Sequence, residues 1–598
     1  MARIQRTQEN LFERPKGSFI VGNRYVYVNT TTRYIPGDKE KGTRGHTDHD
    51  SLCIGVLQNP DDKSSRMFYA NKNYKSWANS DELPDPPKLS DSVAIGLQAF
   101  VDKASETSGL SSLLARVFGA EDAAQILDLA SYMMSQESAV MQHYPAWARK
   151  HAIFSEKIRS DTSIGSFLKD NLSFSKMDLF RQEWLKANIG SGLVYLCYDS
   201  TNVNSQADGV FIVQRGKAKD EPDKPQVNTD YVIRQDDGLP LTYLHSPGSV
   251  PDISQAQEMI SFIDKTSALT GKQIELCLIC DRGYISGKNL RQMDDAHIRY
   301  LLMLRSDMAR YCEIADQCVD SIRSYRNLLE TPDDKELYGM TVKCDELYKN
   351  GPECYAQVLW SGERYNNKRK EAIAVIDNER KEVEKLVNES TGRSFNEKDL
   401  KKLVKQVPAY FELMLEPGEP EVVIQKKRGR GEGTKEVSRP TSRIIGYQEN
   451  ATAIDREIMK AGIIVMVSKD EMTVQEAEDR YHKRDCVEKA FEALKSHLGM
   501  DKIGVTTEEA MHGKGCIWFV ASILHALLFN GTAELRVRDR KSYTTPRMID
   551  YLEAIEADRD LNTGKYKRRY KLTKKQSSIL ACYDTDEAAI DELITALG

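Results

Sequence analysis

The alternation of apolar and polar residues changes character several times along this chain. Residues 18–73 contain short strand-like runs, such as FIVGNRYVYV, separated by Gly, Asp and Lys turns, which predicts a β-rich module over residues 1–90. From residue 92 to residue 149 the apolar residues recur at helical spacing, which predicts a helical module over residues 91–165. The first third of the chain is therefore expected to form two modules.

A different order of elements begins near residue 190. The run LVYLCY predicts a strand that ends in Asp199, and IELCLIC predicts a second strand that ends in Asp281. A hairpin around DDG and a helix are predicted between them, and a short helix and the strand IRYLLML after them. This order predicts an α/β core over residues 166–305. Because reactive groups collect at the carboxyl ends of strands in such sheets, the two aspartates are candidate catalytic residues.

The regular pattern is interrupted between residues 306 and 460. Strand-like pieces alternate there with a heavily charged helical run over residues 378–405, which predicts an insertion domain. The apolar run GIIVMVS then restores the core pattern, and residues 461–535 are expected to complete the core with one long helix. The remaining residues, 536–598, form a basic C-terminal region.

The long helix begins with a capping box, Thr473 and Glu476, and continues as an amphipathic helix. At about 100° per residue, one arc of roughly 60° collects a tyrosine, a carboxylate and two cations, namely Tyr481, Arg484, Glu488 and Lys495. The opposite side is expected to pack against the sheet with Cys486, Val487, Ala490, Ala493 and Leu494. Taken alone, such a stripe is more typical of a solvated helix face than of a site. Glu492 also lies in the stripe, so helix geometry does not choose between the two glutamates.

The net charge of −6 does not indicate nucleic-acid binding, but it does not exclude DNA either, because a DNA enzyme needs only local positive charge. Two basic runs are candidates for phosphate contacts: QKKRGRG over residues 425–431 and KYKRRYKLTKK over residues 565–575. A solvated charged surface explains each run equally well. The candidate DNA-binding residues in the two runs are Lys426, Lys427, Arg428, Arg430, Lys567, Arg568 and Arg569.

Other features point to ordinary structural roles. The 11 cysteines are scattered, as expected of reduced cytosolic thiols, and Cys277 and Cys280 are expected to pack inside a strand. The run HTDHD over residues 46–50 is expected to be a solvated turn rather than a metal site. No signal peptide is visible, and the apolar stretch WFVASILHALLF is too short to span a bilayer, so a buried core helix and no membrane partner are predicted.

Several of these segments together resemble bacterial insertion-sequence transposases with a DDE catalytic triad. The helix stripe matches the Y-x2-R-x3-E-x6-K signature of that family, and this resemblance selects Glu488 over Glu492. LCYDSTN around Asp199 and CDRGYIS around Asp281 resemble the family's two aspartate motifs. KDEPDKPQV, DDGLPLTYLHSPG and TTEEAMHGKGCIWFVASILHALL resemble flanking segments, so the resemblance covers residues 189–305 and 461–535.

The resemblance implies a ribonuclease-H-like catalytic core of the α/β class, interrupted by the insertion domain and preceded by the β-rich and helical modules. In related transposases the insertion is largely β-structured and touches the DNA end, and the charged helical run departs from that pattern. Trp360 in this region is a candidate for stacking on an unpaired base, although a packed aromatic is the better interpretation. The N-terminal β-rich module is a candidate for recognition of the transposon end.

The chemistry expected of such a site is phosphodiester cleavage and strand transfer with two metal ions. Asp199, Asp281 and Glu488 are the candidate catalytic residues and metal ligands, with Asp199 bridging two Mg2+ ions, for which Mn2+ can substitute. Arg484 is suited to hold a DNA phosphate through two hydrogen bonds, Lys495 to supply a point charge and Tyr481 a hydroxyl donor. The resemblance implies that these three residues grip the transposon end.

The expected partners are double-stranded DNA, as transposon ends and as target, and a second copy of the chain in a homodimer. The expected location is the bacterial cytoplasm, in association with the nucleoid. Three alternatives remain: a metal-dependent nuclease without strand transfer, an inactive relative that only binds DNA, and a scaffolding protein without an active site. The three intact carboxylates argue against an inactive relative. A scaffolding protein is disfavoured because it would make every matched motif a coincidence.

Overall fold

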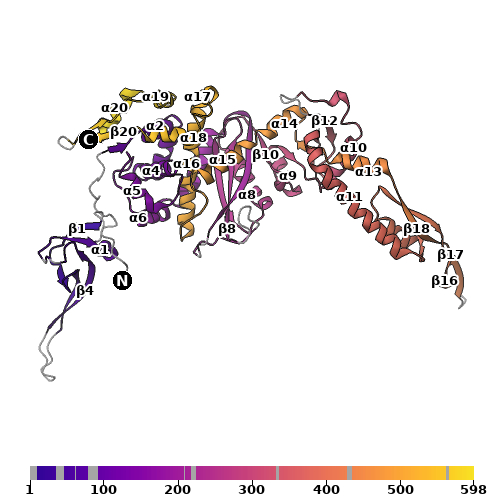
Figure 1. The fold of residues 1–598 in the computed structure, drawn as a ribbon, viewed down its shortest axis with the longest axis horizontal. Helices are drawn as coiled ribbons and strands as arrows, with labels where there is room; N and C mark the ends of the chain where they lie inside the picture. Colours follow the sequence, from indigo (N-terminus) through magenta and orange to yellow (C-terminus); the bar gives the residue numbers. More distant parts are fainter. Residues whose placement is uncertain are drawn as a thin grey trace, which may run out of the picture.

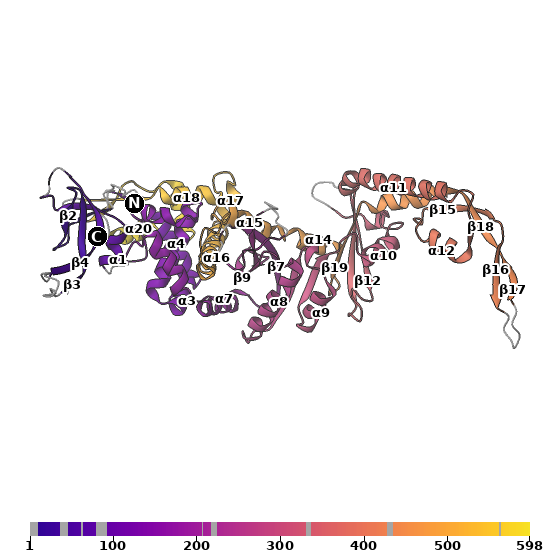
Figure 2. The ribbon, with the colours of Figure 1, turned by 90° about the horizontal axis from the view of Figure 1, so that it is seen from below.

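The computed structural model describes residues 10–35, 46–60, 62, 64–78, 92–205, 207, 209–216, 224–330, 336–426, 434–560 and 564–597. Figures 1 and 2 show an elongated molecule, with a central body between an N-terminal β module at one end and a projecting arm at the other. The body combines a large sheet with many helices, which confirms the predicted α/β class.

The central sheet has eight strands in the order β12-β13-β19-β11-β10-β7-β8-β9. Its strands are β7 (Gly192–Asn204), β8 (Gln226–Arg234), β9 (Pro240–Pro247), β10 (Ile274–Cys280), β11 (Arg299–Met303), β12 (Leu337–Cys344), β13 (Cys354–Ser361) and β19 (Ile463–Ser468). β7, β10 and β11 run parallel to one another, and the other neighbours pair antiparallel. The three parallel strands therefore end at a common edge.

Helices between and after these strands cover the sheet. α8 (Asp252–Ala268) and α9 (Gly287–Asp295) connect the parallel strands, and α10 (Ala309–Cys318) contacts β13 and β19. α14 (Val474–His482) contacts β11, β12 and β13, while α15 (Asp485–Ser496) contacts β7 and β8. These last two helices therefore cross the sheet one after the other.

The predicted insertion domain, residues 306–460, differs from the structure in its first part. β12 and β13 lie inside these boundaries, but β13 pairs with β19 over six residue pairs, so both strands extend the central sheet. Trp360 on β13 is 2% exposed and donates a hydrogen bond to the Met459 carbonyl at 3.0 Å. It is a packed aromatic, as the sequence favoured, and is not placed to stack on a base.

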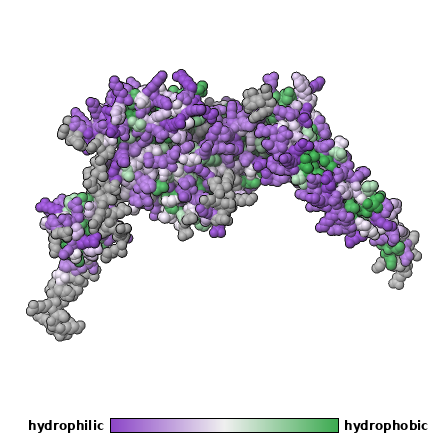
Figure 3. Space-filling view, viewed as in Figure 1, coloured by the Kyte–Doolittle hydropathy of each residue, from purple (hydrophilic) through white to green (hydrophobic). Residues whose placement is uncertain are grey.

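The projecting arm comprises the residues that follow β13. Its elements are α11 (Gly362–Ser390), β14 (Ser394–Asn396), α12 (Glu397–Val404), β15 (Phe411–Pro417), β16 (Glu421–Lys426), β17 (Thr434–Arg439), β18 (Thr441–Glu449) and α13 (Ala451–Lys460). A small core of Ile376, Val383 and Phe411 holds it together. Figure 3 shows apolar side chains on its surface, which include Met414, Leu415, Val422, Ile424 and Ile445.

The N-terminal module is a separate five-stranded sheet with its own apolar core. It contains β1 (Leu11–Glu13), β2 (Phe19–Val21), β3 (Tyr25–Ile35), β4 (His46–Leu57), β5 (Met67–Ala70) and α1 (Lys72–Ala78). Residues 46–50, expected to form a turn, instead begin β4, because they continue the antiparallel ladder with β3 as far as Ile35. The prediction of a turn there was wrong.

The helical module and the C-terminal region share one core with the central sheet. The module contains β6 (Ser92–Ala94), α2 (Gly96–Thr107), α3 (Leu110–Phe118), α4 (Ala120–Gln136), α5 (Tyr144–Ala148), α6 (Asp161–Ser166) and α7 (Phe174–Asn188). The C-terminal part contains α16 (Glu508–Gly531), α17 (Ala533–Arg538), α18 (Thr545–Glu553), β20 (Glu556–Arg559), β21 (Tyr566–Arg568), α19 (Lys574–Ala581) and α20 (Glu587–Ala596). β20 pairs with β6, which ties the two ends of the body together.

α16 is the core helix of the body. It has 24 residues, and among the described residues it alone is long and apolar enough to cross a membrane. However, 72% of its apolar window is buried inside the protein, including Trp518, Phe519 and Leu524. The predicted buried core helix therefore agrees with the structure.

Candidate active site

The two aspartates lie side by side on neighbouring strands. β7 and β10 pair in parallel up to Tyr198 and Cys280, and Asp199 and Asp281 are the next residues on each strand. Neighbouring strands are about 4.8 Å apart, so the two aspartate backbones are in close proximity. β7 does not end at Asp199, as the sequence suggested, because its pairing with β8 continues to Asn204. Asp199 instead marks the end of the parallel pairing.

The helix that carries the glutamate is broken, although the sequence predicted one long helix. The capping box at Thr473 and Glu476 is present, but α14 ends at His482 and α15 begins at Asp485. In the break, the amides of Cys486 and Val487 bond to carbonyls three residues earlier, at 3.1 and 3.0 Å, so the chain makes a tight turn of 3-10 type. Tyr481 therefore belongs to α14, Arg484 lies in the break and Glu488 occupies the first turn of α15.

α15 is held against the sheet by its apolar side. Val487 and Leu494 are completely buried, and Phe491 packs edge-on against Tyr231 of β8 with ring centroids 5.9 Å apart. Tyr231 is the β8 partner of Asp199 in the strand register. The packing of this helix therefore fixes the position of Glu488 relative to the strand that carries Asp199.

Arg484 joins two of the three carboxylates. Its guanidinium donates to Asp199 Oδ2 at 3.2 Å and also forms an ion pair with Glu488. The side chains of Arg484 and Asp199 are only 12% and 15% exposed, whereas that of Glu488 is 55% exposed. Burial acts to lower the pKa of Arg484, but Tyr481 and the surrounding carboxylates outweigh it and raise that pKa. The arginine is therefore a firmly charged counter-ion for the acidic group.

Two tyrosine hydroxyls complete the group. Tyr481 donates to Asp281 Oδ1 at 3.4 Å, and Tyr284 donates to Asp199 Oδ1 at 3.1 Å. Burial, followed by the nearby Asp281 carboxylate, raises the pKa of Tyr481, so its hydroxyl remains a donor. Tyr284 was not among the predicted site residues. The sequence feature that could have identified Tyr284 is its position in CDRGYIS, three residues after Asp281.

The remaining predicted site residues are Lys495 and the cations of the two basic runs. Lys495 is half-buried near the end of α15, roughly 10 Å along the helix from Glu488. Lys426 ends β16 near the tip of the arm (Figure 1), and Lys427, Arg428 and Arg430 lie outside the described residues. In the C-terminal region Lys567 is exposed on β21, but Arg568 pairs with Glu587 and Asp591, and Arg569 with Glu556 and Asp558. These two arginines are already neutralised within the protein.

Whether the three carboxylates fit metal ions depends on Arg484. Within the described part of the chain, no three Asp, Glu, His or Cys side chains are gathered closely enough to hold a metal ion. The guanidinium does show, however, that Asp199 and Glu488 reach a common cation. Carboxylate oxygens are the ligands that Mg2+ prefers. The donor chemistry therefore fits divalent ions, provided that the arginine gives up its contact with Asp199.

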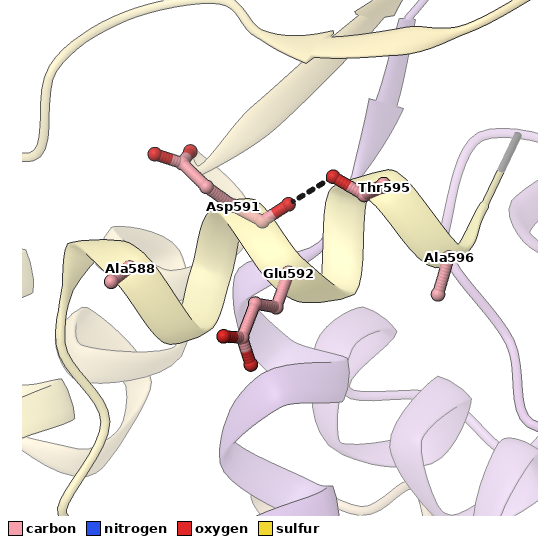
Figure 4. Close-up of a pocket in the computed structure, with 5 residues that line it drawn as sticks. All are labelled: Ala588, Asp591, Glu592, Thr595 and Ala596. Atoms are coloured by element: carbon pink, nitrogen blue, oxygen red, sulfur yellow. Dashed lines mark hydrogen bonds between the residues drawn. The ribbon is translucent and has the colours of Figure 1, made fainter.

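Two surface hollows lie in the described part of the protein, away from the three carboxylates. One hollow lies along a single helix, α20, where Thr595 donates to the Asp591 carbonyl (Figure 4). A second hollow, of about 360 Å³, lies between α7, β9 and α16 and is lined by His245 and His512. Burial lowers the pKa of both histidines, that of His512 to about 4. Neutral histidines in such a place are packed core residues.

Comparison with known proteins identifies the family. No curated protein matches this chain significantly. A solved structure of a piggyBac transposase synaptic complex with hairpin DNA shows 8% identity and a TM-score of 0.30, too low for a structural argument. That match covers 72% of this chain, which spans 62% of the solved chain. The model of the transposase DDE domain matches residues 191–524, which is more than half of the chain and includes all three carboxylates. The chain therefore belongs to the transposase DDE domain family.

Proposed function

We propose that this protein binds the ends of a transposon, cleaves phosphodiester bonds there and transfers the 3′-hydroxyl ends into target DNA. The observation that carries the proposal is the group formed by Asp199, Asp281 and Glu488 around Arg484, in a chain of the transposase DDE domain family. The parallel strands β7, β10 and β11 beside the antiparallel β8 and β9 support a ribonuclease-H-like arrangement of the core.

The metal requirement is part of the proposal. Asp199, Asp281 and Glu488 would hold two Mg2+ ions, with Mn2+ as a substitute. Asp199 would be the shared ligand because it neighbours Asp281 in the strand register and shares the Arg484 guanidinium with Glu488. Bound ions of this kind stabilise the attacking and leaving oxygens of an in-line displacement at phosphorus. Tyr284 would orient the Asp199 carboxylate through its hydroxyl.

The neighbouring residues are suited to grip DNA. Arg484 has a planar guanidinium that forms paired hydrogen bonds with a phosphate as readily as with a carboxylate. We infer that in the DNA complex it turns from Asp199 to a phosphate beside the scissile bond, while Lys495 contributes charge further along α15. Tyr481, held by Asp281, would donate its hydroxyl nearby.

The partners follow from the same assignment. We propose that the protein binds double-stranded DNA as transposon end and as target, and that two copies hold two ends in one complex. The motif resemblance to bacterial insertion-sequence transposases supports both statements, and it supports a location in the bacterial cytoplasm at the nucleoid.

The test is cleavage of a labelled duplex that carries the terminal sequence of the encoding element, in Mg2+, by three proteins. The wild type and Glu492→Gln should cleave and join, and Glu488→Gln should bind the duplex without cutting it. Glu492 is a matched control because it lies one turn further along α15 and is exposed. Cleavage without joining would indicate a nuclease, and binding without cleavage by all three would contradict a catalytic role.

A further inference from the structure

An excess of cations gathers on two segments of the C-terminal region, the second of which is the end of the basic run at residues 565–575. Residues 536–547 carry Arg536, Arg538, Arg540, Lys541 and Arg547 with one carboxylate, Asp539. Residues 570–575 add Lys571, Lys574 and Lys575 and no carboxylate. This local excess of positive charge contrasts with the net charge of −6 for the whole chain.

The two segments form one surface. Lys575 at the start of α19 donates to Ser542 Oγ at 3.2 Å and to the Tyr551 hydroxyl at 2.9 Å, which joins α19 to the loop after α17 and to α18. Arg547 donates to the Lys541 carbonyl across the same loop. Figure 1 shows α17 and α19 along one edge of the body, and Figure 3 shows that this edge is mostly hydrophilic with a few apolar side chains.

The charges on this surface are only partly neutralised from within. Asp539 accepts the Ser542 amide at 3.1 Å and attracts Lys575 of the same surface. Arg538 reaches Glu534 only at 3.6 Å, with both side chains at least 74% exposed, which is a weak pair. Arg540, Lys541 and Lys574 are exposed and have no carboxylate partner among the residues that the structure describes.

Two cations of the surface also repel each other. The guanidinium of Arg536 is held against the Phe529 ring and donates to the Phe529 carbonyl at 2.8 and 3.2 Å, so it cannot move away. Burial and then the charge of Arg540 lower the pKa of Arg536. An anion bound between the two would relieve this repulsion. Tyr570, 72% exposed at the edge of the surface, offers an additional contact.

The position of the surface relative to the active site suits a DNA duplex. α15 extends from the first turn, which holds Glu488, to its C-cap His497, whose ring stacks on His525 of α16 with centroids 6.2 Å apart. From His525, α16 continues for about 9 Å to Gly531, where α17 follows. These two helices and the ring contact bring the start of α17 within roughly one turn of B-DNA, about 34 Å, of Glu488.

We propose that the surface of α17, its following loop and the start of α19 binds the phosphate backbone of duplex DNA, independently of sequence, within about one helical turn of the scissile phosphate. The proposal rests on the proposed function, because the active site sets the position of the duplex. Long, exposed lysine and arginine side chains contact phosphates without reading bases. The surface therefore suits target or flanking DNA, whose sequence varies.

The experiment measures binding of a fluorescent random-sequence 40-base-pair duplex by fluorescence anisotropy, from 50 to 200 mM KCl without divalent ions. The variant is Arg538→Ala/Arg540→Ala/Lys541→Ala. Each lost phosphate contact lowers the magnitude of the slope of log affinity against log salt by about 0.9. Three lost contacts should therefore make the loss of affinity between 50 and 200 mM KCl about 40-fold smaller than in the wild type. The single variant Arg540→Ala should lower the slope by about 0.9.

The matched control is Arg568→Ala/Arg569→Ala, which removes two arginines of the same region that already pair with carboxylates and should leave the slope unchanged. Arg538→Lys/Arg540→Lys keeps the charge and should keep the wild-type slope. A triple variant that retains the wild-type slope would overturn the inference, as would an equal loss in the control. Failure of the proposed function would appear separately, as a wild type that does not cleave transposon ends.

Discussion

Removal of Arg484 should destabilise the metal-free protein. In Arg484→Ala, the Asp199 carboxylate, only 15% exposed, loses the guanidinium 3.2 Å away but keeps the Tyr284 hydroxyl and the Ser200 amide. Breaking a buried ion pair from one side typically costs about 3–5 kcal/mol, and two remaining donors reduce that cost. Glu488 adds little because it is half-exposed. We expect a decrease of about 2–3 kcal/mol in the free energy of unfolding.

Magnesium should reverse this loss selectively. In the wild type, a divalent ion has to displace the guanidinium from Asp199, whereas in Arg484→Ala this guanidinium no longer competes with the ion. A ligand at 100 times its Kd stabilises a folded protein by about 2.7 kcal/mol, which is close to the expected loss. Urea unfolding in EDTA and in a series of Mg2+ concentrations should therefore show a larger Mg2+-induced stabilisation in the variant.

The control is Arg480→Ala, another arginine of the same segment. Arg480 bonds to Asp236 and Gln235 at 3.2 Å and lies over the Tyr195 ring, on α14 before the break. Its removal should leave the response to Mg2+ as in the wild type. An equal Mg2+ effect in wild type and Arg484→Ala, or no loss of stability in EDTA, would refute the view that Arg484 occupies the place of a cation.

Three further predictions concern the surroundings of the site. Tyr284→Phe removes the hydroxyl from Asp199 and should slow end cleavage about fivefold, because about 1 kcal/mol of orienting interaction is lost, with DNA binding unchanged; equal rates would contradict the role of Tyr284. Leu494→Ala leaves a cavity beneath α15 and should cost about 2–5 kcal/mol in thermal unfolding, whereas Lys489→Ala on the exposed face should cost almost nothing. The pKa of His512 and that of His525 are each lowered to about 4 by burial, so unfolding takes up protons below pH 6.5. Stability present above pH 6.5 should fall by about 3 kcal/mol per histidine down to pH 4 in urea titrations, and His512→Gln should lack its share.

The strand-borne half of the site is visible in the sequence for a physical reason. A buried parallel strand needs a nearly continuous apolar run, so a charged residue directly after such a run marks the place where the strand leaves the core. LVYLCY before Asp199 and IELCLIC before Asp281 have this form, and the structure places both aspartates where the pairing of β7 with β10 ends.

The helix-borne half required tertiary information. Nothing in the sequence at Lys483 and Arg484 announces a break, because neither Gly nor Pro is present, and both residues favour helices. The turn brings the Arg484 guanidinium to Asp199 while Glu488 remains within its reach. A helical wheel describes a single helix, so it cannot predict the contact with Asp199 on the strand. The partners of Arg568 and Arg569 are likewise invisible in the sequence, because a basic run does not reveal which carboxylates fold against it.

The topology explains how Glu488 reaches the aspartates across a long separation in sequence. Trp360 on β13 pairs with Ile463 on β19, and the Ser361 amide bonds to the Gly462 carbonyl at 3.0 Å, so the arm leaves and re-enters the core at one point. β19 then pairs between β13 and β11, and the chain continues directly into α14 and α15. The relative positions of Asp199, Asp281 and Glu488 therefore depend on strands that are neighbours in the sheet and not on the path of the arm. Because closing a longer loop adds little entropy cost, an arm of this size can be carried at that point without displacing Glu488 from Asp199.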